Sequence, residues 1–194
     1  MSIAAVNLIV ALPAEAKPLR RHFGLRRDPR HSAFPIHAAD DIRLIISGPG
    51  KCRAAAACGY LSAARPAEST RWLNIGIAGH ADAAIGETVL IDEVIDRGSG
   101  RQWQLRHAGE QAPTRLHTLD KPTGDYPDDA LIDMEAAGVL HALTAAQTPI
   151  DTIHIIKTVS DNRHHPAQHI NAALCEQLIA QAIVEIEKHL ETTP

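Results

Sequence analysis

The sequence has few aromatic residues, no excess of positive charge and no long apolar run. Phenylalanine, tryptophan and tyrosine make up 3% of its 194 residues, too few for the stacking surface on which proteins bind single-stranded nucleic acid. The formal net charge is -4, so nothing attracts the chain generally to nucleic acid or to an anionic membrane. No apolar run approaches the roughly 20 residues of a membrane span. We therefore expect no nucleic-acid partner and no membrane span.

Cysteine is also scarce, and its spacing indicates free thiols. The chain has three cysteines, Cys52, Cys58 and Cys175, and no two of them form a CxxC pair. An odd, unclustered set of this kind is typical of reduced thiols in a cytoplasmic protein. The N-terminal residues lack the basic segment that precedes a secretory signal. These features predict a cytoplasmic location.

Histidines are frequent near residue 165, but their arrangement does not favour a metal site. His164 and His165 stand next to each other before Pro166, and His169 follows. Adjacent histidines lack the i,i+4 spacing with which a helix presents two metal ligands, and no acidic residue is spaced to complete a set. A solvated loop is the better interpretation, and we expect neither a metal nor a cofactor.

Short apolar runs alternate with helical patterns along the chain. Apolar and alternating runs predict strands, and helix-start and helix-stop residues bound the helices between them. The predicted strands are 3–12, 35–37, 42–47, 71–77, 86–95, 102–106, 115–119 and 152–159; the predicted helices are 14–23, 52–64, 133–147 and 167–190. We expect one α/β domain over residues 1–194, a three-layer α/β/α sandwich with a mixed, mostly parallel central sheet.

Three acidic residues are candidates for a site at the carboxyl ends of the strands, where ligands bind in such sheets. Glu15 and Glu135 are expected in the first turns of helices, and Asp161 directly after a strand. Each also has an ordinary structural role, because first-turn acids complement the helix dipole and Asp forms turns. An ionised carboxylate accepts hydrogen bonds only, which suits the hydroxyl groups of a ribose.

Six segments in sequence order resemble the purine nucleoside phosphorylase and methylthioadenosine/adenosylhomocysteine nucleosidase superfamily. Together they extend over almost the whole chain. They are Ala11-Leu12-Pro13-Ala14-Glu15, Ser47-Gly48-Pro49-Gly50-Lys51, Asn74-Ile75-Gly76-Ile77-Ala78-Gly79, Gly86-Glu87-Thr88-Val89-Leu90-Ile91, Asp133-Met134-Glu135-Ala136-Ala137 and Val159-Ser160-Asp161.

The resemblance implies a fold, an activity and a role for each matching residue. The implied activity is cleavage of the N-glycosidic bond of a purine nucleoside, such as methylthioadenosine or adenosylhomocysteine, by a homodimer. Glu15 is expected to activate water, and Asp161 to donate a proton or hydrogen bond to the base. Glu135 is expected to hold the ribose hydroxyls, with Met134 against the sugar. The other substrate-binding positions are Ile77, Ala78, Gly79 and Ser160.

Departures from the superfamily pattern shape these expectations. Ile77 and Asn74 stand where the phosphorylases carry phosphate ligands, which favours a hydrolase, although Arg20 or Lys51 offers a positive charge for phosphate. His80 replaces a glycine and puts a titratable ring near the site. The segment 120–132 is shorter than in relatives, which have a helix, a strand and a base-contacting loop there. A short branch linked to hopanoid synthesis has a similar Gly-Ile-Ala-Gly turn.

Two alternatives to a hydrolase therefore stay open. The first is a phosphate-dependent nucleoside phosphorylase, including one of the hopanoid-linked type. The second is a nucleoside-binding protein that has kept the ribose site and lost turnover with the shortened segment.

Overall fold

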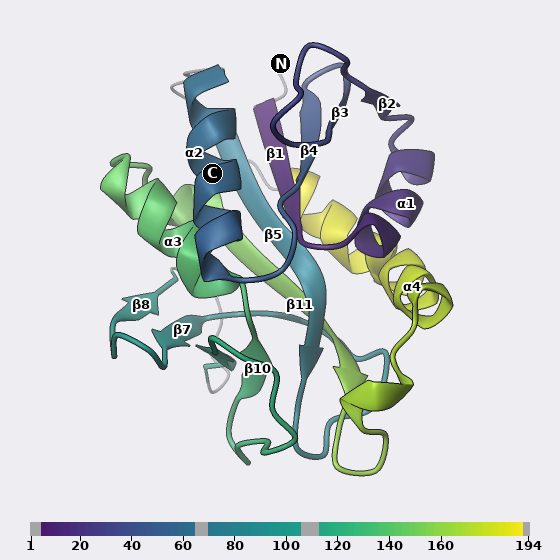
Figure 1. The fold of residues 1–194 in the computed structure, drawn as a ribbon, viewed down its shortest axis with the longest axis vertical. Coiled ribbons are helices and arrows are strands. Elements are labelled where there is room, and N and C mark those ends of the chain that lie inside the picture. The colour runs from purple at the N-terminus through teal and green to yellow at the C-terminus, as the bar shows by residue number, and fades with distance from the viewer. Residues whose placement is uncertain (1–4, 65–69, 106–112, 192–194) are drawn as a thin grey trace.

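The computed structural model describes residues 5–64, 70–105 and 113–191 (Figure 1). Within these residues, eleven strands form one sheet: β1 (Ala5–Val10), β2 (Arg26–Arg27), β3 (Ile36–Ala39), β4 (Ile42–Ile46), β5 (Thr70–Gly79), β6 (Thr88–Leu90), β7 (Glu93–Asp96), β8 (Gln102–Gln104), β9 (Arg115–Thr118), β10 (Leu131–Asp133) and β11 (Ile153–Asp161). The helices are α1 (Pro13–His22), α2 (Lys51–Ala64), α3 (Ala136–Ala145) and α4 (Ala172–Glu191), with short 3-10 turns η1 (Ile150–Thr152) and η2 (Ala167–His169).

The sheet is mixed, as the sequence predicts. Its centre is parallel: β1 pairs with β4 and β5, and β5 pairs with β11. Antiparallel pairings surround this centre, β3 with β4 on one side and β6 with β11 on the other. At its end β5 leaves β1 and pairs with β10, where Gly79 faces Ile132. The carboxyl ends of β1, β5 and β11 therefore lie beside the β10–α3 connection.

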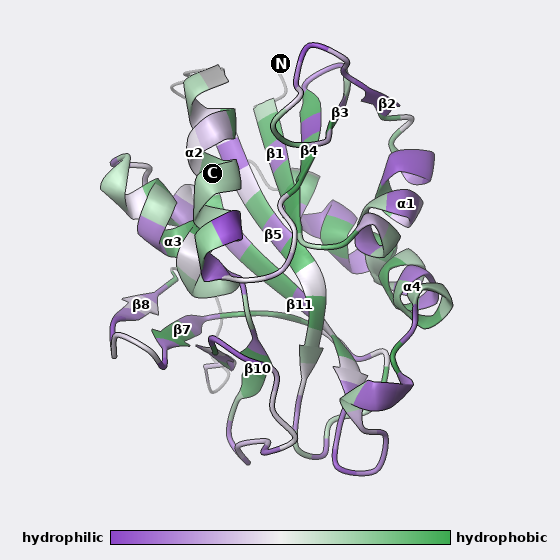
Figure 2. Ribbon diagram, viewed as in Figure 1, coloured by the Kyte–Doolittle hydropathy of each residue, from purple (hydrophilic) through white to green (hydrophobic). Residues whose placement is uncertain are grey.

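Helices cover both faces of the sheet, which confirms the three-layer architecture. Figure 1 shows α2 and α3 together on one face and α1 with α4 on the other. Successive residues of β1 point to opposite faces, as the two-residue period of a strand requires. Leu8 packs into the core under α1 and α4, and Ile9 into the core under α2 and α3. Figure 2 shows apolar residues along the central strands β1, β5 and β11.

The structure corrects three of the predicted elements. The run 86–95 is two strands, because β6 pairs with β11 whereas β7 pairs with β8 and β9. The helix expected from Asp133 begins at Ala136, since Asp133 ends the unpredicted strand β10. The helix expected from Ala167 begins at Ala172, after η2. Residues 3, 4 and 106 of the predicted strands lie outside the described residues.

Candidate active site

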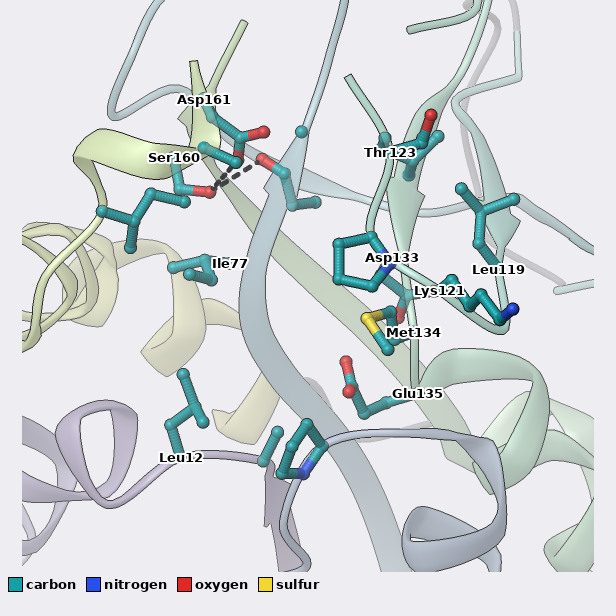
Figure 3. Close-up of a pocket in the computed structure, with 18 of the residues that line it drawn as sticks. Leu12, Ile77, Leu119, Lys121, Thr123, Asp133, Met134, Glu135, Ser160 and Asp161 are labelled. Atoms are coloured by element: carbon teal, nitrogen blue, oxygen red, sulfur yellow. Dashed lines mark hydrogen bonds between the residues drawn. The ribbon is translucent and has the colours of Figure 1, made fainter. Parts of the chain in front are cut away.

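A cavity of about 200 Å³ opens at the carboxyl ends of the central strands (Figure 3). It lies among the ends of β1, β5, β10 and β11, as expected for a sheet of this kind. Every residue that the sequence placed in the site lines this cavity: Glu15, Ile77, Ala78, Gly79, Met134, Glu135, Ser160 and Asp161. The structure thus brings together residues from the two ends and the middle of the chain.

Glu15 is held by backbone donors from two strand ends. The N–H groups of Ala11 and Leu12 each donate to Oε2 at 2.8 Å, and the Ile77 N–H donates to Oε1 at 3.1 Å. Leu12 is the residue just before α1, and Glu15 is the third residue of that helix. A glutamate at this position commonly accepts a hydrogen bond from the backbone N–H of the residue before the helix and so caps it. Glu15 therefore has the ordinary capping role and also lines the cavity. Its side chain is buried, and burial raises its pKa although the backbone bonds oppose the shift.

Lys157 lies close to Glu15, just outside the set of residues that line the cavity, and was not predicted as a site residue. It belongs to β11, is 1% exposed, and places Nζ 2.9 Å from Asp133 Oδ2. A Cβ added to Gly76 would lie 3.0 Å from Glu15 Oε1 and 3.5 Å from Lys157 Nζ, so only a glycine leaves these groups their present positions. Burial alone would lower the pKa of Lys157, but the charges of Asp133, Glu135 and Glu15 outweigh it and raise that pKa. Lys157 is therefore a cation.

Glu135 occupies the position just before α3, and not the first turn that the sequence predicts. The Asp133 carboxylate accepts from the Ala136 N–H at 2.8 Å and so caps the helix from two residues further back. The Gly50 N–H donates to Glu135 Oε1 at 2.8 Å. Burial, and then the charge of Asp133, raises the pKa of Glu135 to about 7. Figure 3 shows its carboxylate directed into the cavity, with Met134 beside it.

Asp161 ends β11 and accepts hydrogen bonds from two hydroxyl groups. Ser160 Oγ donates to Oδ1 at 2.5 Å, and the Tyr126 hydroxyl donates to Oδ2 at 2.6 Å. The pairing with β5 is irregular between Val159 and Asp161, as at a β-bulge, which redirects side chains at a strand end. A Cβ on Gly79 would lie 2.8 Å from Asp161 Oδ2 and 2.7 Å from Tyr126 Cε1, so this glycine is what lets the two side chains meet.

Asn74 and Lys51, two residues considered in connection with phosphate, have other partners in the structure. Asn74 is buried and its Nδ2 donates to the Ile9 carbonyl at 3.2 Å. Lys51 pairs with Asp96 at 2.5 Å and with Asp120 at 2.8 Å. Neither Arg20 nor any of these residues belongs to the cavity wall, to which Lys121 contributes a basic side chain.

His80 has a structural role in the turn that follows β5. Its Nδ1 accepts from the backbone N–H groups of Asp82 and Ala83, at 3.1 and 3.0 Å. The ring thus caps the turn and is not part of the cavity wall.

The described residues contain neither a metal-binding cluster nor a membrane-spanning helix. Residues 5–64, 70–105 and 113–191 contain no group of three or more His, Cys, Asp or Glu side chains arranged to hold a metal ion. Over the same residues, no helix is both long enough and apolar enough to cross a membrane. The three cysteines are free: Cys52 is exposed, and Cys58 and Cys175 are buried.

Comparison with known proteins gives matches in structure only. No family model and no curated protein matches the sequence. The 5'-methylthioadenosine nucleosidase of Arabidopsis thaliana matches with a TM-score of 0.82 at 18% identity, over 100% of this chain and 98% of that one. The 5'-methylthioadenosine/S-adenosylhomocysteine nucleosidase of S. pneumoniae, solved with a transition-state inhibitor, matches with a TM-score of 0.76 at 16% identity. The match covers 96% of this chain and 98% of that one. The futalosine hydrolase of Helicobacter pylori matches with a TM-score of 0.71 at 14% identity, over 97% of each chain.

These three proteins share one fold, and each match extends over nearly the full length of both chains. The same fold is indicated by the sequence motifs, by the mixed sheet and by the position of the cavity. The chain has the fold of the nucleoside phosphorylase and nucleosidase superfamily.

Proposed function

We propose that this protein is an enzyme, an N-ribosyl hydrolase that cleaves the glycosidic bond of a purine nucleoside such as methylthioadenosine or adenosylhomocysteine. The observation that carries the proposal is the convergence of Glu15, Glu135 and Asp161 on one cavity of about 200 Å³, in a chain with the nucleosidase fold. Acidic residues from three distant parts of the chain gather at a buried site only at a cost in desolvation, which a ligand-binding role explains.

The geometry supports a division of labour among the three carboxyl groups. Asp161 gives a proton to the base while the bond between the sugar C1′ and the base nitrogen breaks. The electron pair of that bond goes to the base. Glu15 takes a proton from the water that attacks C1′, and burial raises its pKa, which makes it a stronger base. Positive charge builds on the sugar in this reaction, and the nearby carboxylates stabilise that charge.

Glu135 and Met134 form the sugar side of the proposed site. Gly50 donates to one oxygen of Glu135, while no residue in the described ranges hydrogen-bonds its other oxygen. That oxygen is free to accept from a ribose hydroxyl. The Met134 side chain, an adaptable apolar surface, packs against the sugar ring.

Hydrolysis is favoured over phosphorolysis by the charges around the cavity. Phosphate binding needs basic side chains or several free N–H groups. Asn74 carries no charge and donates to the Ile9 carbonyl, Lys51 is paired with two aspartates, and Lys157 is surrounded by carboxylates. Among the described residues that line the cavity, Lys121 alone is basic. Water is therefore the better nucleophile for this site.

The quaternary state is implied by the resemblance alone, whereas the location is predicted from the spacing of the cysteines and from the N-terminal residues. We propose a homodimer in the cytoplasm. Sedimentation of the purified protein measures the first, and a monomer at micromolar concentration would rule it out.

The test is release of free base from methylthioadenosine, adenosylhomocysteine, inosine and adenosine, each with and without phosphate. Release without phosphate is expected, with equal amounts of base and reducing sugar. Release only with phosphate, and with a sugar phosphate as product, would establish a phosphorylase instead. Binding without release, unchanged in Glu15→Ala and Asp161→Asn, would establish a binding protein.

A further inference from the structure

The loop 119–130 between β9 and β10 sends one side chain back to the proposed site. Tyr126 is 8% exposed, whereas its neighbours Gly124 and Asp125 are exposed. Its hydroxyl reaches Asp161 Oδ2 at 2.6 Å, 35 residues further along the chain. The ring packs with Ala81 and Ile132 in a small apolar cluster. An otherwise exposed loop thus contributes one phenol group that hydrogen-bonds to Asp161, the residue that we propose as the proton donor.

The end of β11 also fixes the backbone of this loop. One guanidinium nitrogen of Arg163 donates to the Tyr126 carbonyl at 3.3 Å and pairs with Asp128. The other nitrogen pairs with Asp82 at 3.1 Å. Arg163 is two residues beyond Asp161, so the same strand end holds both the tyrosine carbonyl and its hydroxyl. This double attachment sets the position of the hydroxyl relative to Asp161.

Both oxygens of Asp161 therefore face hydroxyl donors before any reaction begins. When an acid gives up its proton, negative charge builds on its oxygens, and hydrogen bonds to those oxygens become stronger. Donors placed in advance at the point where charge develops lower the barrier for that step. Burial, and then the hydrogen bond to Asp161, raises the pKa of Tyr126 to about 12. The phenol thus keeps its proton at neutral pH and acts as a donor.

We propose that Tyr126 is a positioning residue that stabilises the carboxylate formed when Asp161 gives its proton to the leaving base. The proposal rests on the proposed hydrolase function. In the balanced step, the Asp161 proton moves to the base nitrogen, the C1′–N bond breaks, water bonds to C1′, and Glu15 takes the water proton. Tyr126 exchanges no atom or electron and shortens its bond to Asp161 Oδ2. Such help matters only for a leaving group that needs a proton.

That condition supplies the test. Tyr126→Phe removes the hydroxyl and keeps the ring, and two substrates are compared: inosine, whose base needs protonation, and p-nitrophenyl β-ribofuranoside, whose phenolate leaves without it. Removing one donor of this kind typically costs about 10²- to 10³-fold in kcat. We expect a loss of this size for inosine, with KM changed by less than about twofold, and no change for the nitrophenyl substrate.

The second tyrosine of the chain provides the matched control. The Tyr60 hydroxyl lies 3.1 Å from His31 Nδ1, and Tyr60 is not part of the cavity wall. Tyr60→Phe is expected to leave both substrates unchanged. Should Tyr126→Phe fold poorly, difluorotyrosine in the Tyr60→Phe background changes only the donor strength of Tyr126. It is then expected to alter kcat for inosine alone.

The outcomes separate the two proposals. Equal losses for the two substrates would show that Tyr126 only supports the loop, and no loss for either would show that it does nothing for Asp161; both overturn this inference and leave the hydrolase intact. A wild-type protein that releases base from no nucleoside overturns the proposed function, and this inference with it.

Discussion

Lys157 places a positive charge among buried carboxylates, and the charge balance of the site depends on it. Its ammonium lies 2.9 Å from Asp133, and the charges of Glu15 and Glu135 also act on it. Removing one partner from a buried ion pair leaves an uncompensated charge, which typically costs about 3–5 kcal/mol. The side chain therefore stabilises the fold and offsets the repulsion among the acids.

Lys157→Met is expected to lower the free energy of unfolding by about 3–5 kcal/mol and to abolish base release. Denaturant unfolding measures the first effect. Lys17→Met, which breaks the exposed pair with Glu176, is the matched control and should change stability by less than about 1 kcal/mol. The double variant Lys157→Met/Asp133→Asn should recover part of the loss. Equal stability of Lys157→Met and the control would contradict this account of the charge balance.

The raised pKa of Glu135 makes two opposite predictions about pH. An acid whose pKa rises from 4.5 to about 7 on folding binds its proton more tightly in the folded state. Its contribution to stability is therefore present below pH 4.5 and is lost as the pH rises through about 7. The proposed binding of ribose by Glu135 has the reverse dependence on pH, because only the ionised carboxylate accepts on both oxygens.

We therefore expect kcat/KM to increase as the pH rises through about 7, the pKa of Glu135. In Glu135→Gln this increase in kcat/KM with pH should disappear, and kcat/KM should be lower overall. The measurement is kcat/KM for one nucleoside between pH 5 and pH 9, both outer values being about two units from that pKa. A step that persists unchanged in Glu135→Gln would assign it to another group.

The sequence could identify some of these residues but not all of them. Glu15, Glu135 and Asp161 stand in short motifs, so local pattern and resemblance were sufficient to name them. Lys157 lies in an apolar strand, and its importance comes from Asp133 and Glu15 on other elements. Tyr126 lies in a loop, and nothing near it in the sequence indicates a contact with Asp161.

At the scale of elements, the crossing of α2 and α3 sets the position of Glu135. A Cβ on Gly138 would lie 2.1 Å from the Lys51 carbonyl oxygen and 2.7 Å from two further backbone atoms. Backbone atoms at a helix start have no room to move aside. This close approach also brings the Gly50 N–H within 2.8 Å of Glu135. The glycine in α3 is thus needed for the helix packing and for the position of Glu135 in the proposed site.

Gly138→Ala is expected to destabilise the protein by about 3 kcal/mol, the upper end of the usual cost of overpacking. The corresponding decrease in Tm is roughly 6–12 °C for a chain of this size. Gly59→Ala, in α2 with no atom within 4 Å of the added Cβ, is the control and should be neutral or stabilising. Tm values that agree within error would refute the close-crossing argument.

Element prediction failed where the partner of a strand decides its limits. The alternating run 86–95 continues across a break that exists only because β6 pairs with β11 and β7 with β9. Strand β10 is three residues long and is defined by its neighbours β5 and β9. By contrast, strands on both sides of the turn at Asp40, whose φ is 47°, were predicted from local residues.

At the scale of the whole molecule, the cavity exists only because distant segments meet. Its wall joins the ends of β1, β5 and β11 to the β10–α3 connection and to the loop that carries Lys121. The architecture was predictable because alternating strands and helices restrict the possible topologies. The shape of the cavity near Asp161, where we propose that the base binds, was not predictable, because it depends on how the loop 119–130 packs against the end of β11.

The central claim is that Glu15 activates water for attack on a nucleoside held by this cavity. The most direct test is the rate of base release by Glu15→Gln in phosphate-free buffer, with Glu176→Gln on the surface of α4 as control. Loss of a general base typically costs about 10²- to 10⁴-fold in kcat, and we predict a loss in this range with the control unchanged. Wild-type rates for Glu15→Gln, or no release by the wild-type protein, would contradict the claim.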